Sequence, residues 1–108
     1  MIKPKSLNIL GIPHSVIYCG KPSEVDPLGR EPLLGCCDEL KREMRIYDAD
    51  KIEDTWTTIL HESLHAIAGL LRLECLSAES QRSHDELDLL ALALADMLFR
   101  NGLIKLDG

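Results

Sequence analysis

The amino-acid sequence predicts an α+β fold, with a small antiparallel or mixed sheet of about three strands and two packed helices. Short segments rich in strand-forming residues occupy the first half of the chain, and two long segments with apolar residues spaced three and four apart occupy the second half. Strands followed by helices are typical of folds in which helices cover one face of a sheet. With 108 residues, the chain is expected to form one domain, residues 1–108.

Three strands are expected before the helices. Leu7–Leu10 and Ser15–Cys19 flank the turn signal Gly11-Ile12-Pro13, which favours a hairpin between them. Residues 20–35 carry three prolines and three glycines, so a loop is expected there. From Arg42 to Tyr47 polar and apolar residues alternate, which is the pattern of a half-exposed strand.

The first helix is expected from about Asp50 to Leu73. Asp50 and Glu53 have the spacing of a capping box, with Asp in place of the usual Ser or Thr. The apolar stripe expected to face the protein interior consists of Trp56, Leu60, Leu64, Ile67 and Leu71.

The second helix is expected to start at Ser83, which forms a second capping box with Glu86, and to stop at Asn101-Gly102. Leu103–Leu106 are expected to add a short terminal strand. The expected inward stripe of this helix consists of Leu87, Leu90, Ala91, Leu94 and Leu98.

Composition and charge exclude several classes of partner. The net charge is −6, which disfavours binding to phosphate backbones and to anionic membranes, so neither a nucleic acid nor a membrane is expected as a partner. No apolar run reaches the roughly 18 residues that span a bilayer, and the start of the chain is too polar for a signal peptide. A cytoplasmic protein is therefore expected, in which the four cysteines, none in C-x-x-C spacing, are reduced and buried.

The sequence His61-Glu62-Ser63-Leu64-His65 indicates a zinc site. Two histidines four residues apart lie on one side of a helix, where both imidazoles can bind one Zn²⁺. Glu62 follows the first histidine and is expected on a neighbouring face, where it can accept a proton from a zinc-bound water and pass it to a leaving amine. This arrangement predicts hydrolysis of a protein or peptide substrate, with zinc as the cofactor and Glu62 as the base.

A catalytic zinc usually takes three protein ligands and a water, so a third ligand is expected. His84 is preferred, because it lies three before Leu87 and seven before Ala91 and shares their inward face. Asp85, Glu86 and Glu79 remain as alternatives. Candidates for stabilising the negative charge that develops on the substrate carbonyl oxygen are Tyr18, Tyr47 and His14.

The positions three and six after His65 hold Ala68 and Leu71, where a metzincin has Gly and His, so a metzincin is not expected. The long gap from His65 to the next candidate ligand suits a gluzincin-like plan, in which the third ligand comes from a separate helix. The motif lies within Thr58–Ile67, after Leu7–Pro13 and Gly35-Cys36-Cys37-Asp38 and before the closing helix. In these segments the chain resembles short H-E-x-x-H metallopeptidase-like proteins of phage and prophage type. They are distant relatives of ImmA/IrrE-type and minimal gluzincin domains.

The resemblance implies a minimal zincin-like fold, with zinc at His61 and His65 and with Glu62 as base. Such proteins often have a Glu third ligand at the start of the closing helix. Here that position falls on His84 or Asp85, which would give a His₃ or a His₂Asp site. In zincins an edge strand before the motif helix can pair with substrate, a role expected here for Met44–Tyr47.

Two other functional hypotheses remain. The chain could be a non-catalytic or latent zinc-binding regulatory or interaction protein of phage-related type, although a purely structural site needs no base such as Glu62. It could instead be a metal-free domain in which the motif is fortuitous. Metal analysis separates the last hypothesis from the other two.

Overall fold

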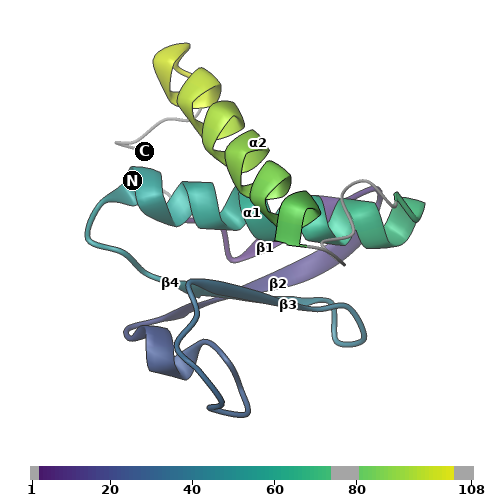
Figure 1. The fold of residues 1–108 in the computed structure, drawn as a ribbon, viewed down its shortest axis with the longest axis vertical. Helices are drawn as coiled ribbons and strands as arrows, with labels where there is room; N and C mark the ends of the chain where they lie inside the picture. The colour runs from purple at the N-terminus through teal and green to yellow at the C-terminus, as the bar shows by residue number, and fades with distance from the viewer. Residues whose placement is uncertain (1–2, 74–80, 104–108) are drawn as a thin grey trace.

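A computed structural model describes residues 3–73 and 81–103 of the chain. It has the expected α+β class, with a mixed sheet followed by the helices α1 and α2 (Figure 1). The sheet has four strands rather than three, in the order β1-β2-β4-β3. The predicted terminal strand at Leu103–Leu106 falls largely outside the described residues.

The N-terminal hairpin is confirmed. Strand β1 (Ser6–Ile9) pairs antiparallel with β2 (Ile12–Cys19), with Ile9 opposite Ile12. The two-residue turn is Leu10-Gly11, and both residues have positive φ, as in the turns that match the twist of a hairpin. Pro13 therefore lies inside β2 rather than in the turn. It is tolerated there because β4 starts pairing with β2 only at Ser15, so no sheet hydrogen bond needs the missing N–H.

The strand expected at Arg42–Tyr47 is β4 (Glu43–Tyr47), and its buried residues alternate as predicted. It lies in the interior of the sheet, however, parallel to β2 on one side and antiparallel to β3 (Gly35–Asp38) on the other. The prediction that it is an edge strand was wrong. Strand β3 is the edge strand next to β4, and its four residues lack the alternation that would have marked them as a strand. The preceding loop contains only a short 3₁₀ helix, η1 (Pro22–Glu24).

Helix α1 (Ile52–Leu71) lies across one face of the sheet (Figure 1). Lys51 occupies the N-cap without a side-chain cap, so the capping box predicted at Asp50 is wrong, since the helix begins later. The helix ends at Arg72, which has a left-handed backbone and donates its N–H to the Ala68 carbonyl.

The face that α1 buries differs from the predicted stripe. Its buried residues include Thr55, Ile59 and Glu62, none of which belongs to the predicted stripe. Of the stripe, Trp56 and Ile67 are partly buried against the core, whereas Leu71 is exposed. Because the sheet covers one side of α1 and α2 packs on another, one apolar stripe does not describe the helix. The core between sheet and helix consists of Ile9, Val16, Met44, Ile46, Ile59 and Ala66.

Helix α2 (Gln81–Arg100) packs on α1 and rises from it on the side away from the sheet (Figure 1). Gln81 already lies within this helix, so Ser83 is not its N-cap and the predicted second capping box is wrong. The carboxylate of Glu86 pairs with Arg82 at 3.1 Å. The predicted stop is confirmed, because Gly102 has positive φ and Leu103 donates its N–H to the Leu98 carbonyl.

The residues that α2 buries are Leu87, Ala91 and Ala95. Leu87 and Ala91 were expected there, Ala95 was not, and Leu90 is exposed contrary to expectation. Within residues 3–73 and 81–103, neither helix is apolar enough over sufficient length to cross a membrane.

Candidate functional site

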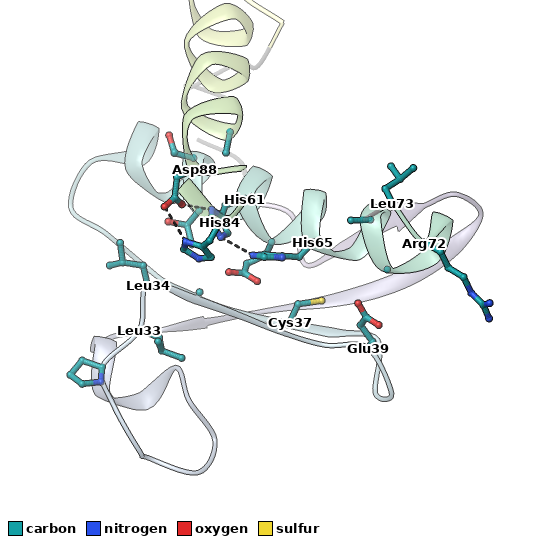
Figure 2. Close-up of a pocket in the computed structure, with 18 residues that line it drawn as sticks. Leu33, Leu34, Cys37, Glu39, His61, His65, Arg72, Leu73, His84 and Asp88 are labelled. Atoms are coloured by element: carbon teal, nitrogen blue, oxygen red, sulfur yellow. Dashed lines mark hydrogen bonds and ion pairs between the residues drawn. The ribbon is translucent and has the colours of Figure 1, made fainter. Parts of the chain in front are cut away.

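A cleft of about 890 Å³ opens between the sheet edge and the two helices (Figure 2). Strand β3 and the loop before it form one wall, α1 forms the opposite wall, and the start of α2 closes one side. The cleft is lined by His61, Glu62 and His65 of the predicted motif and by His84. The other lining residues are Pro32, Leu33, Leu34, Gly35, Cys37, Glu39, Thr57, Thr58, Ala68, Gly69, Arg72, Leu73, Asp88 and Ala91.

The three predicted zinc-ligand histidines meet in this cleft. His61 and His65 lie one turn apart on α1, with their Nε2 atoms 3.0 Å from each other. His84 comes from the first turns of α2, and its ring centroid is 5.2 Å from that of His61 and 6.0 Å from that of His65. One ring nitrogen from each histidine lies within 4.8 Å of the others, so the three imidazoles could hold one metal ion.

The spacing of the nitrogens fits tetrahedral zinc. Two Zn–N bonds of about 2.0–2.1 Å at the tetrahedral angle require nitrogens about 3.3 Å apart. The Nε2 atoms of His61 and His65 are separated by a similar distance, 3.0 Å. Three neutral imidazoles are also a common donor set for catalytic zinc.

Asp88 is a part of the site that the sequence did not reveal. Its Oδ1 atom lies 2.6 Å from Nδ1 of His61, and its Oδ2 atom lies 3.5 Å from Nδ1 of His84 (Figure 2). When the Nδ1–H of His61 donates a hydrogen bond to this carboxylate, Nε2 keeps a free lone pair directed toward His65. The same carboxylate–histidine relation orients metal ligands in many metalloproteins. The available signal was the position of Asp88, four residues after His84 on one face of a helix.

Burial keeps the two α1 imidazoles neutral. The pKa of His65 is lowered to about 4, first by burial and then by the neighbouring His61 and His84. Burial also lowers the pKa of His61, although Asp88 acts in the opposite direction. Neutral imidazole is the form that binds a metal, so both ligands are ready to do so near neutral pH.

Glu62 lies on the face of α1 that meets the sheet, where its side chain packs against Gly35 of β3. Only 6% of it is exposed, yet it contributes to the wall of the cleft. Burial and, to a smaller extent, the negative charge of Asp88 raise the pKa of its carboxyl group to about 7. The motif therefore places its acidic residue between the histidines and strand β3.

The alternative third ligands lie elsewhere. Asp85 and Glu86 are exposed on α2, and neither lines the cleft. Asp85 belongs to a second, overlapping group with His84 and Asp88, but that group includes neither histidine of α1. Glu79 lies outside the described residues. His84 is therefore the candidate that the fold brings to His61 and His65.

The residues predicted to stabilise the carbonyl oxygen are not at the cleft wall. His14 is a fully buried residue of β2, and its Nδ1 atom lies 2.9 Å from the Ile12 carbonyl oxygen. Tyr18 donates its hydroxyl to the Pro4 carbonyl at 2.6 Å, and Tyr47 is not a lining residue. The prediction of this role for any of the three was wrong.

Cys19 is a buried free thiol, as expected, whereas Cys36 and Cys37 are half-buried free thiols on β3. Burial raises the pKa of Cys37 to about 12, and it also raises the pKa of Cys36. Neither belongs to a metal-binding group among the described residues. Cys75 lies outside those residues.

Comparison with known proteins found no match. No protein-family model, no curated protein and no solved structure is similar enough to this chain to identify a family. The function is therefore inferred from the cleft and its residues.

Proposed function

We propose that the chain is a zinc-dependent peptidase in which His61, His65 and His84 hold the metal and Glu62 is the general base. The observation that carries this proposal is the convergence of three imidazoles from two helices beside a buried carboxylate in one cleft. A site that held zinc only for structure would need no proton acceptor next to it.

When bound, zinc would supply a Lewis acid that polarises a peptide carbonyl and lowers the pKa of water at the site toward about 7. The protein's own groups do the rest. Glu62 accepts a proton from the attacking water on a carboxylate oxygen and delivers it to the nitrogen of the leaving amine. Asp88 accepts a hydrogen bond from the Nδ1–H of His61 and thereby holds that imidazole in the orientation that a ligand needs.

The free edge of β3 provides a place for an extended peptide. Leu34 lies opposite Tyr47, and Tyr47 donates its N–H to the Leu34 carbonyl, so these two form a hydrogen-bonded pair. Because such pairs alternate along antiparallel strands, the next pair, Gly35 and Ile46, has no hydrogen bonds between its two residues. By the alternation of antiparallel strands, the backbone groups of Gly35 and Cys37 then point away from β4 toward the free edge. A substrate chain could pair with them by strand addition, which favours an unfolded protein segment over a compact small molecule. In this proposal the strand that pairs with the substrate is β3, rather than Met44–Tyr47 as expected from the sequence.

The test is a comparison of the parent protein with Glu62→Gln. We expect both to bind about one zinc per chain, measured by elemental analysis of protein never exposed to chelator, and only the parent to cleave an unfolded protein such as fluorescein-labelled casein. An amide cannot accept the proton from water, although it has nearly the shape of the carboxylic acid.

Three outcomes would contradict the proposal. A parent protein that neither contains nor takes up zinc would favour the metal-free hypothesis. Zinc binding without hydrolysis of any unfolded substrate would favour the non-catalytic zinc-binding protein. Hydrolysis at the parent rate by Glu62→Gln would remove Glu62 from the role of base.

A further inference from the structure

The first residue of β3 lies directly against the side chain of Glu62. A β-carbon added to Gly35 would lie 2.8 Å from Oε1 and 2.9 Å from Cγ of Glu62, and 2.7 Å from Cγ2 of Thr58. Real β-carbons essentially never approach other heavy atoms this closely. The space that any side chain at position 35 would need is therefore already filled by α1.

We propose that Gly35 is a positioning residue for Glu62, because its missing side chain forms the seat in which the carboxylate of Glu62 packs against strand β3. The positioning role rests on the proposed function, in which Glu62 is the general base. The contact between Gly35 and Glu62 is a structural feature that does not depend on catalysis. Gly35 is not needed here for its backbone freedom, because its φ is not in the positive region. The requirement is close approach of the strand to the helix.

Gly35 places the proposed base, Glu62, next to the edge of β3 at which a substrate chain would pair. Gly35 also directs its backbone N–H and C=O toward the free edge of β3, as the register with Ile46 implies. The same residue would thus hold the proton acceptor and pair with the substrate chain beside it. Moving the carboxylate by about 1 Å could cost on the order of 10²-fold in rate, because a general base must lie within hydrogen-bond reach of its proton.

A substitution at position 35 should move Glu62 rather than unfold the protein. Two of the three atoms that an added β-carbon would meet belong to the Glu62 side chain, which can rotate, and the third belongs to a side-chain methyl group. We therefore expect Gly35→Ala to keep its fold and its zinc while Glu62 leaves its seat. Gly20→Ala is the matched control, because Gly20 has open space around its α-carbon and no positive φ.

The experiment has two readouts on the full chain. The first is NMR: the parent should show contacts between the Glu62 side-chain protons and the Gly35 α-protons, and Gly35→Ala should shift the Glu62 carboxyl resonance, whereas Gly20→Ala should leave it unchanged. The second is hydrolysis of fluorescein-labelled casein by zinc-loaded protein. We expect kcat to fall about 10²-fold in Gly35→Ala with zinc affinity within a few-fold of the parent, and no change in Gly20→Ala.

If Gly35→Ala alone fails to fold, the double variant Gly35→Ala/Thr58→Ser removes the nearest contact, and Thr58→Ser alone is its control. That variant should fold and still show a displaced Glu62. The inference is overturned if the Glu62 carboxyl resonance is unmoved, if kcat stays at the parent value, or if kcat falls only in proportion to lost zinc. A parent that binds zinc but cleaves no casein would instead contradict the proposed function, and the NMR comparison would still decide whether Gly35 seats Glu62.

Discussion

Replacing the buried carboxyl group of Glu62 by an amide should change how the stability of the metal-free protein depends on pH. The pKa of Glu62 is raised from 4.5 to about 7, mainly by burial. Between these values the folded protein holds a proton that the unfolded chain has released, so this group makes the folded state less stable as pH rises through the window. Glu62→Gln has no proton to lose and should be free of that effect.

The size of the effect follows from the shift. Each pKa unit corresponds to about 1.4 kcal/mol, so the interval from 4.5 to about 7 is worth about 3 kcal/mol, of which about 2 kcal/mol falls between pH 5 and pH 8. Glu62 as a whole is only 6% exposed, so solvent screening reduces this only slightly. The lowered pKa values of His61 and His65 act in the opposite direction, but both proteins contain these histidines, and their contribution largely cancels in the comparison.

The assay is urea unfolding of chelator-treated parent and Glu62→Gln at several values of pH from 5 to 8. We expect the free energy of unfolding of Glu62→Gln to rise relative to that of the parent by about 2 kcal/mol over this range. A difference between the two proteins that is independent of pH would refute the reasoning, because it would mean that Glu62 ionises as freely in the folded protein as in the unfolded chain.

Three further predictions test the remaining parts of the structure. Asp88→Asn should weaken zinc binding by about 10- to 100-fold in a competition titration, because the amide holds the His61 imidazole less well; parent-like affinity would contradict this role. His84→Ala should weaken zinc binding by orders of magnitude, whereas Asp85→Ala and Glu86→Ala should lower stability by about 1 kcal/mol at most; the reverse result would move the third ligand to a carboxylate. Ile59→Ala should lower the free energy of unfolding by about 2–5 kcal/mol, measured with urea, since Ile59 is fully buried between α1 and the sheet.

Local patterns in the sequence were enough to predict several elements. The alternation in β4, the hairpin signal around Gly11 and the stop at Gly102 each depend on residues within a few positions of one another. The pair His61 and His65 is local in the same sense, because helix geometry alone places residues four apart on one side. The inward phase of His84 followed likewise from its spacing to Leu87 and Ala91.

The tertiary structure decided the features that depend on contacts between distant segments. Strand β3 exists because Gly35–Asp38 finds a partner in β4, and nothing in its own composition marks a strand. The buried face of α1 was mispredicted because the sheet packs on one side of that helix and α2 on another. Glu62 is buried because it lies on the side that meets the sheet.

What the sequence by itself determined about this protein is therefore the chemistry it can carry: two imidazoles and a carboxylate on one helix, with a third imidazole phased inward on the next. Only the tertiary structure decided that Asp88 lies beside His61, that β3 is an edge strand, and that Gly35 lies against Glu62. The physical reason is that helix and strand periodicity set the direction of a side chain relative to its own element. Which group it meets there depends on packing between elements that are far apart in the chain.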